Sequence, residues 1–246
     1  MPVVAALFSA KGSPGTTTFG EALVAVMSRE GRAMLAELDA DGGDRAAAPG
    51  LALQPGLTSL AAAVRHGPVS EDLLSLHLQE LPAGGHVLVG PASPDQAHAA
   101  LASIVPQFAV ALEGSDEWNV IADCGRARSR SPSFEVARHA DLAVVVTHPT
   151  LEGVEHACER VAALDEIGAR SRVVLVGRQP YGPDEVAGVV GCPVLGVIAH
   201  DPVGAQLVRT GQAASRAGRR SLLMRSVGSL ARTLMTDRAS LAGVSP

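Results

Sequence analysis

The sequence has few aromatic residues, 2% of its 246 positions, and charged residues make up 18%. Apolar residues still make up 47%, which excludes a disordered chain and is enough to form a large buried core. No uncharged apolar run reaches the roughly 18 residues that a transmembrane helix needs. The first residues also lack the basic segment of a secretory signal. We therefore expect a globular cytoplasmic protein.

Cysteine is scarce as well. Cys124, Cys158 and Cys192 are odd in number and widely separated, and no pair of histidines lies close to them in the sequence. This pattern excludes a disulfide framework and a zinc site of the usual spacing. We expect free thiols in a reducing compartment.

Lysine is almost absent: of the 20 Lys and Arg residues, only Lys11 is a lysine. A lysine is a compact charge on a thin stem, so it can enter a phosphate pocket that a planar guanidinium would overfill. We therefore treat Lys11 as a candidate functional residue. The net charge of −5 gives no general affinity for nucleic acid.

Short apolar runs that do not alternate with polar residues are separated by helical patterns along the whole chain. This arrangement predicts parallel strands buried on both faces, at residues 3–8, 33–38, 86–89, 119–122, 142–147, 172–176 and 194–198. Helices are expected between them, the first at residues 21–29. The predicted fold is α/β: one domain over residues 1–246, with a doubly wound, mostly parallel sheet of about seven strands and helices on both faces.

Ligands of such sheets bind at the carboxyl ends of the strands. A segment rich in glycine and threonine, residues 9–18, follows the first predicted strand there. Gly12 and Gly15 allow a backbone bend whose N–H groups converge on an anion, and Thr17 is placed as the hydroxyl that ligates Mg²⁺ in a P-loop. The alternative is an ordinary turn capped by threonine.

The segment Ala10-Lys11-Gly12-Ser13-Pro14-Gly15-Thr16-Thr17 resembles the deviant Walker A motif of the MinD/ParA family of P-loop ATPases. The likeness spans roughly residues 3–235 and is greatest to the branch with septum-site and pilus-assembly localisers (CpaE/TadZ-like). It implies a homodimer that encloses ATP and Mg²⁺, with Lys11 reaching the partner's phosphates. The implied nucleotide-binding residues are Lys11, Gly12, Ser13, Pro14, Gly15, Thr16, Thr17 and Thr18.

Two further segments extend the resemblance. Residues 37–44 are similar to the family's switch I, where Asp39 falls on the aspartate that acts on the attacking water. Residues 120–125 are similar to its Walker B strand, which implies that Asp123 reaches Mg²⁺ through water. The implied catalytic residues are thus Lys11 and Asp39, and the implied metal residues are Thr17, Asp39 and Asp123.

The sequence also departs from the family pattern. The second P-loop lysine, which grips the β- and γ-phosphates, is replaced by Thr16, and a neutral hydroxyl cannot stabilise transferring charge as a cation does. Glu37 occupies a position where the family more often has Asp. The family's asparagine that recognises adenine would lie near positions 177 and 178, where this sequence has Gly177 and Arg178 instead. Two hypotheses follow. One is an ATP-dependent dimerising switch with weak hydrolysis that positions a septum, pilus or chromosome component. The other is a pseudo-ATPase scaffold that binds nucleotide weakly or not at all.

Several polar residues near the expected site could either take part in ligand binding or simply be solvated. Asp41 and Asp44 fit a solvated acidic turn slightly better than a switch. His148 and His200 end predicted strands and could contact a ligand. Three alternating arginines would all point the same way in an extended segment, toward an anion or into solvent: Arg126, Arg128 and Arg130.

The carboxyl-terminal region predicts a basic amphipathic helix at about residues 215–238. An apolar stripe of Leu223, Val227, Leu230 and Leu234 is flanked by arginines. We favour packing of this stripe on the sheet over contact with an anionic membrane or with DNA. The expected partners are a second copy of the chain and an unidentified protein.

Overall fold

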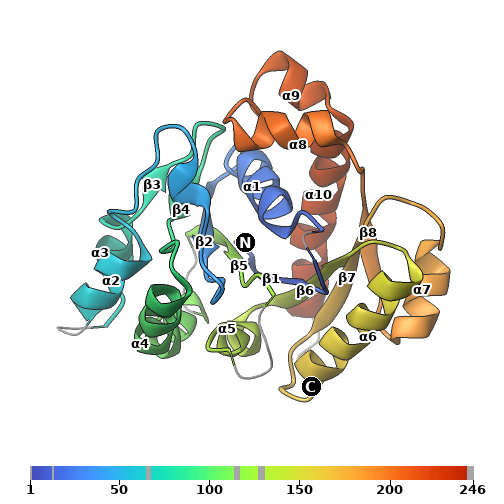
Figure 1. The fold of residues 1–246 in the computed structure, drawn as a ribbon, viewed down its shortest axis with the longest axis horizontal. Coiled ribbons are helices and arrows are strands. Elements are labelled where there is room, and N and C mark those ends of the chain that lie inside the picture. The colour runs from blue at the N-terminus through green and yellow to red at the C-terminus, as the bar shows by residue number, and fades with distance from the viewer. Residues whose placement is uncertain (1, 13, 65–67, 114–116, 127–130, 243–246) are drawn as a thin grey trace.

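The computed structural model describes residues 2–12, 14–64, 68–113, 117–126 and 131–242, the last of these without side-chain detail beyond residue 235. At its centre is an eight-stranded sheet in the order β3-β4-β2-β5-β1-β6-β7-β8 (Figure 1). The predicted doubly wound, mostly parallel sheet is confirmed. Its strands are β1 Val4–Ser9, β2 Arg32–Glu37, β3 Gln79–Glu80, β4 His86–Leu88, β5 Trp118–Asp123, β6 Leu142–Thr147, β7 Ser171–Val176 and β8 Val194–Ile198.

All seven predicted strands are present, and one further strand was not predicted. β3 has two residues and pairs antiparallel with β4 at the edge of the sheet, whereas the other pairs are parallel. Two polar residues, Gln79 and Glu80, give no apolar pattern from which a strand could be predicted.

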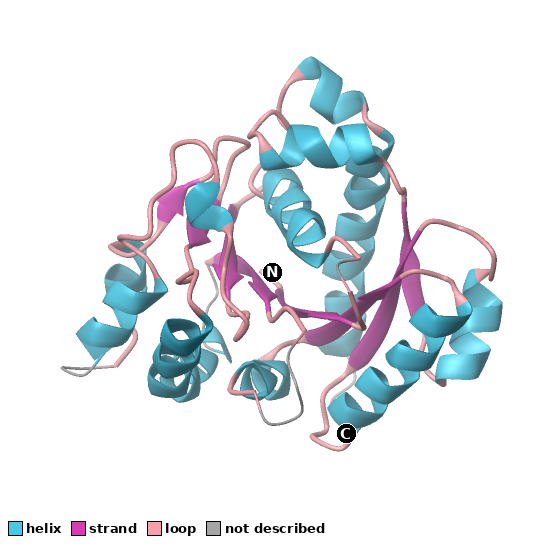
Figure 2. Ribbon diagram, in the orientation of Figure 1, coloured by secondary structure: helices cyan, strands magenta, loops and turns pink. Residues whose placement is uncertain are grey.

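Helices cover both faces of the sheet (Figure 2). α1, α8 and α10 lie on one face with α9 beside them, and the helices from α2 to α7 lie on the other (Figure 1). Their bounds are α1 Thr16–Met27, α2 Leu57–Ala63, α3 Glu71–Ser75, α4 Pro94–Glu113, α5 Ser133–His139, α6 Leu151–Asp165, α7 Pro183–Val190, α8 Pro202–Arg209, α9 Arg216–Arg220 and α10 Leu222–Ala242, with a 3₁₀ turn η1 at Arg45–Ala47.

Alternate residues of the central strands form two separate apolar layers. Ala6 and Phe8 of β1 belong to the layer under α4 to α7, whereas Ala5 and Leu7 belong to the layer under α1 and α10. All six residues of β1 are buried. Burial on both faces explains why the strands read as continuous apolar runs in the sequence.

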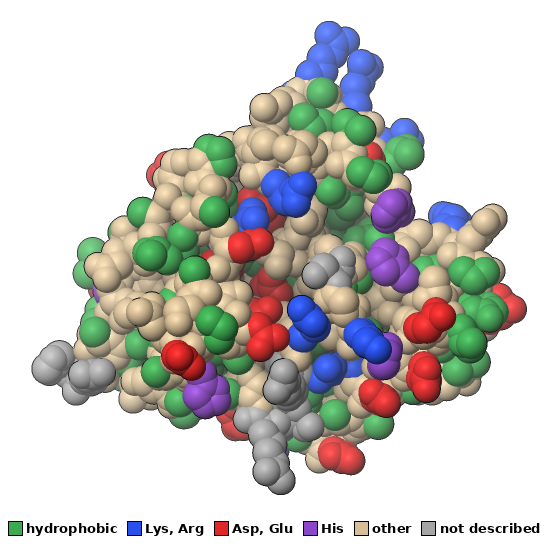
Figure 3. Space-filling view, viewed as in Figure 1, with side chains coloured by type: hydrophobic (Ala, Val, Ile, Leu, Met, Phe, Trp, Pro, Cys, Tyr) green, Lys and Arg blue, Asp and Glu red, His purple; other side chains and the backbone are tan. Residues whose placement is uncertain are grey.

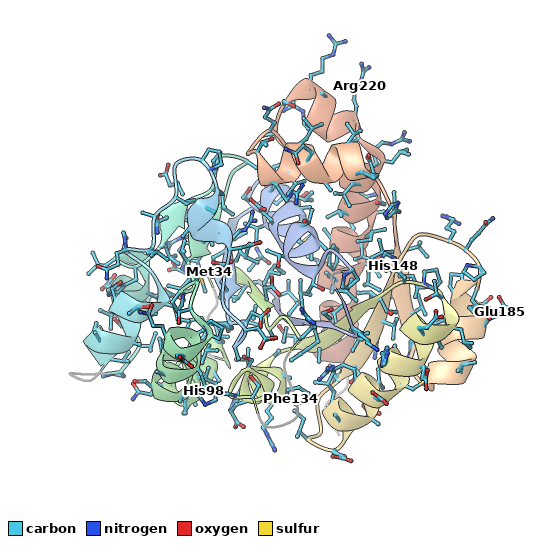
Figure 4. The ribbon with its side chains drawn as sticks, viewed as in Figure 1. Met34, His98, Phe134, His148, Glu185 and Arg220 are labelled. Carbon is cyan, nitrogen blue, oxygen red and sulfur yellow. The ribbon has the colours of Figure 1, made fainter. Side chains whose placement is uncertain are left out.

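The predicted carboxyl-terminal helix is divided in two, which corrects the expectation of one helix over residues 215–238. Ser221 is extended between α9 and α10, and its hydroxyl accepts a hydrogen bond from the N–H of Met224 at 3.2 Å. The apolar stripe is buried against β8 and α1, as the packing interpretation predicted. The arginines stay exposed, and Arg220 points away from the body of the molecule (Figure 4).

Two other expectations concern single features. The first helix begins at Thr16, five residues before the predicted start at Glu21, because the threonines of the loop already form its first turn. All three cysteines are free thiols, with Cys124 and Cys192 buried. In the part of the chain that the structure describes, no helix is long and apolar enough to cross a membrane.

Candidate functional site

The loop between β1 and α1 has the backbone geometry of an anion-binding turn. Gly12 and Gly15 have φ values of +71° and +93°, which other residues rarely adopt, and a β-carbon on either would meet nothing within 4 Å. Gly15 is the N-cap of the 12-residue helix α1, and no side chain caps it. The first amide groups of α1 have no intrahelical acceptor, so they are available to an anion at the positive end of the helix.

A polar cleft of about 370 Å³ lies over this loop. The loop contributes Gly12 and residues 14–18, and the ends of β2 and β5 contribute Asp39 and Asp123. The strand register explains the convergence, since Leu7 and Glu37 both pair with Asp123 across the sheet. Three segments far apart in the sequence therefore meet at one edge. Figure 3 shows acidic and basic side chains gathered around the middle of this face.

Asp123 is 3% exposed and is tied to the loop. Burial raises the pKa of Asp123 to about 6, against the opposing effect of hydrogen bonds from the Thr17 hydroxyl and the Gly125 N–H. The negative charge of Asp39 adds to the rise. A buried carboxylate beside a hydroxyl and a second carboxylate favours a bound cation.

Asp39 lies directly against the end of β5. A β-carbon on Gly125 would overlap the Asp39 carboxylate, so only glycine permits this approach. The pKa of Asp39 is raised, mainly by burial, while a hydrogen bond from the Asp41 N–H and the charge of Arg126 oppose the rise. The Asp41 N–H donates to Asp39 Oδ1 at 2.9 Å.

Glu37 holds the turn that follows β2 and does not line the cleft. Its Oε1 accepts hydrogen bonds from the N–H groups of Asp44 and Arg45, each at 3.1 Å, and its Oε2 accepts one from Gly90 at 2.9 Å. Burial raises the pKa of Glu37 to about 7, although these three hydrogen bonds lower it. The structure thus gives Glu37 a structural role that the sequence did not indicate.

A buried ion pair joins the same turn to α1. Arg45 Nη1 lies 2.9 Å from Glu21 Oε2, and the two side chains are 7% and 2% exposed. Arg45 also pairs with Asp44 at 3.0 Å. Neither Glu21 nor Arg45 could be singled out from the sequence, because an ion pair between residues 24 positions apart leaves no periodic signal.

A second cavity of about 270 Å³ adjoins the cleft and is more apolar. It is lined by β-strand ends and by the loops after them, including Val176, Ile198 and Asp201. His148, in the loop between β6 and α6 (Figure 4), also lines it, as does His200. The centroids of the two rings lie 6.2 Å apart. The structure therefore places both histidines at a cavity. Four residues line both the cavity and the cleft: Pro14, Gly15, Thr18 and Arg209.

The remaining predicted residues have different surroundings. Lys11 is exposed and does not line the cleft, whereas Asp44 and Arg126 do. Asp41 is exposed, as expected for a solvated turn. Ser13, Arg128 and Arg130 lie outside the described residues.

The site suits a nucleotide with Mg²⁺ better than a metal ion alone. Thr16 is 6% exposed, and its Oγ1 is a buried polar atom with no hydrogen-bond partner. Such an atom costs free energy unless a partner reaches it, and a phosphate oxygen would be one. Within the described ranges no group of three or more His, Cys, Asp or Glu side chains could hold a metal. Mg²⁺ is usually held by one or two carboxylates together with substrate phosphates, which matches this inventory.

The sheet order and the position of the loop after β1 match the fold of solved ParA and MinD ATPase structures. The chain is similar to the ParA family ATPase from Chlorobium tepidum, with a TM-score of 0.77, 19% identity, and coverage of 94% of this chain and 98% of that one. It is similar to the cell division ATPase MinD from Pyrococcus furiosus, with a TM-score of 0.75, 17% identity, and coverage of 96% and 99%.

A third similar structure is the septum site-determining protein MinD of Pyrococcus horikoshii, complexed with Mg-ADP. Its TM-score is 0.69 at 19% identity, over 99% of this chain and 98% of that one. The sequence itself matches no protein-family model, and no curated protein is significantly similar to it. The likeness is therefore one of fold.

Proposed function

We propose that this protein is a nucleotide-dependent switch that binds ATP with Mg²⁺ in the polar cleft and dimerises around it. The observation that carries the proposal is the convergence of residues 14–18, Asp39 and Asp123 on one cleft at the carboxyl edge of the sheet. The Mg-ADP complex of the similar MinD structure supports the choice of ligand.

The loop and the start of α1 would bind the phosphates through main-chain N–H groups of residues 12–13 and 15–18. Ser13 and Pro14 are members of this loop, but Pro14 has no N–H to donate and would only shape it. Thr17 and Asp123 would hold Mg²⁺, which neutralises phosphate charge when it is bound. Asp39 would accept a hydrogen bond from water at the phosphate end of the cleft. The adjoining cavity with His148 and His200 would hold the base, since it opens on the same loop residues.

Hydrolysis in this proposal is weak. Thr16 supplies a hydroxyl where the resembling family has a lysine, and a missing cation lowers electrostatic stabilisation of the transferring phosphoryl group. Thr16 still provides a partner for a phosphate oxygen through its buried hydroxyl. The loss of the lysine therefore weakens ATP hydrolysis more than it weakens nucleotide binding.

Binding of ATP would control dimerisation. In the dimer, Lys11 of one copy would reach the phosphates bound to the other copy. Lys11 is exposed, so its side chain is free to cross to a second molecule. The biological output would be the positioning of a cellular partner, namely a septum, pilus or chromosome component. The similar structures support this class of function because they include septum-site and cell division ATPases.

A second candidate is a pseudo-ATPase scaffold, favoured by the Thr16 substitution. Titration calorimetry with ATP and Mg²⁺, combined with light-scattering measurement of the mass with and without nucleotide, separates the two. The switch predicts heat of binding and a dimer in ATP. Absence of both would contradict the switch and favour the scaffold.

A further inference from the structure

Among the described residues, three arginines that the sequence motif does not use line the polar cleft. Arg45, Arg126 and Arg209 line it together with the loop that lacks its usual second lysine. They differ in what already balances their charge, and this difference shows which of them is available to a ligand.

Arg45 is committed to the protein. Its guanidinium pairs with Glu21 and Asp44, and its side chain is 7% exposed. Arg126 is exposed, but its charge acts on Asp39, and its backbone N–H also bonds to that carboxylate. Both arginines therefore serve the turn after β2.

Arg209 is the exception. It is the last residue of α8, which packs against α1, and its side chain is exposed. Its Nη2 donates to the neutral amide oxygen of Gln206 at 2.8 Å, and in the described part of the chain no carboxylate lies within ion-pair distance of it. Its charge reaches the buried Glu21 on α1: burial raises the pKa of Glu21, and the charge of Arg45 and, least of all, that of Arg209 oppose the rise.

The position of Arg209 also identifies the part of a ligand that it faces. It lines both the polar cleft and the apolar cavity, as do Pro14, Gly15 and Thr18 of the loop. A nucleotide whose base lies in the cavity and whose terminal phosphate lies in the cleft has its intervening phosphates next to these shared residues. Thr16, with its unpartnered buried hydroxyl, lies in the same loop.

We propose that Arg209 is a phosphate-binding residue that supplies from α8 the positive charge that Thr16 does not. This inference rests on the proposed nucleotide function. It adds that the ligand is a nucleoside di- or triphosphate held by a cation from outside the loop. An arginine offers several donors to phosphate oxygens at once, which suits a site on the flank of the loop.

The test is titration calorimetry of the full chain with Mg-ATP and Mg-ADP. Arg209→Gln should weaken both affinities by about tenfold, as expected for loss of a charge-assisted hydrogen bond. Arg209→Lys should lose less affinity than Arg209→Gln, because it keeps the charge but not the several donors of the guanidinium. The matched control is Arg220→Gln, which removes an exposed arginine at the tip of α9 and should leave both affinities unchanged (Figure 4).

A rescue experiment tests the relation to the loop. Thr16→Lys should tighten binding in the wild-type background and restore affinity in Arg209→Gln to within about twofold of Thr16→Lys alone, since one cation then replaces the other. If Arg209→Gln binds like wild type, or if Thr16→Lys leaves its defect unchanged, the inference is overturned. If the wild-type chain itself binds no nucleotide, the proposed function fails and this inference fails with it, which is a distinguishable result.

Discussion

Gly125 and the side chain of Asp39 lie so close together that there is no room for a methyl group on residue 125. Gly125 has φ +56°, and a β-carbon there would overlap the carboxylate of Asp39. Ser9, the last residue of β1, donates its N–H to the Gly125 carbonyl at 2.7 Å, so the strand that leads into the loop contacts the same residue. One glycine thus sets the spacing between two walls of the cleft.

Gly125→Ala should therefore destabilise the protein and displace Asp39. The left-handed conformation and the overlap together predict a loss of about 1–3 kcal/mol in the free energy of unfolding, measured with urea. Mg-ATP affinity should fall in parallel. The matched control is Gly188→Ala in α7, where a β-carbon meets nothing within 4 Å, and it should stabilise the helix by a few tenths of a kcal/mol to about 1 kcal/mol. Equal effects of both substitutions would contradict the steric account.

Breaking the buried Glu21–Arg45 pair should be costly. Glu21→Met leaves a buried guanidinium without its main partner and should lower the free energy of unfolding by about 3 kcal/mol. The double variant Glu21→Met with Arg45→Met should recover most of that loss, since no unpaired charge remains. As a control, Glu117→Gln breaks an exposed pair with Arg32 and should cost less than about 1 kcal/mol. A double variant as unstable as the sum of both singles would show that the pair is not coupled.

Asp201 should give the protein an acid-dependent component of stability. Its side chain caps α8 by accepting from the Gly204 N–H at 2.9 Å, and it accepts from the Leu223 N–H of α10 at 3.1 Å. The pKa of Asp201 lies below the ordinary 3.8, mainly because its carboxylate accepts the Gly204 hydrogen bond. Desolvation opposes this shift, and hydrogen bonds from further backbone N–H groups add to it. The ionised form therefore stabilises the folded state above pH 3.8, and this contribution is lost as the pH falls through the lower folded pKa.

Unfolding free energies from pH 7 to pH 2 test this. Asp201→Ala should cost about 1 kcal/mol at neutral pH through loss of the cap, and the deficit should shrink as the pH falls. Asp201→Asn keeps a capping oxygen and should lose only the pH-dependent part. Asp184→Asn, in the exposed first turn of α7, is the control and should follow wild type. A deficit in Asp201→Ala that is constant with pH would refute the charged cap.

Lys11→Ala should abolish ATP-dependent dimerisation and leave the monomer folded, because the side chain is exposed in the structure. Lys11→Arg should fail to restore the dimer, since a guanidinium is too wide for a pocket built for a lysine. Light scattering with and without Mg-ATP measures the dimer, and thermal unfolding checks the fold. Normal dimerisation of Lys11→Ala with ATP would exclude a role across the interface.

The sheet could be predicted because its strands are buried on both faces. Residues 142–147, for example, are all apolar except the last, and all six are buried. The edge strand of Gln79 and Glu80 could not be predicted, because pairing with β4 and not its own composition makes it a strand. The break at Ser221 was hidden for a related reason: the apolar stripe of α10 continues the pattern of the preceding residues, whereas the break is fixed by contacts from Asp201 and from Ser221 itself.

The convergence of the site residues could be predicted for those that lie at or shortly after the carboxyl end of a strand. Asp123 ends β5, Asp39 lies two residues after β2, and Thr17 lies in the first turn of α1 after the loop from β1. Parallel pairing brings the carboxyl ends of these strands to one edge. Glu21, Arg45 and Arg209 were missed, because they reach the cleft region through helix packing and a 3₁₀ turn. No spacing in the sequence encodes those contacts.

The short strand β3 also affects how the protein can associate with itself. At this side the sheet ends in two residues, so few main-chain N–H and C=O groups are offered to a strand from another molecule. Growth of the sheet by strand addition is disfavoured there, and any contact at that margin has to be made by side chains.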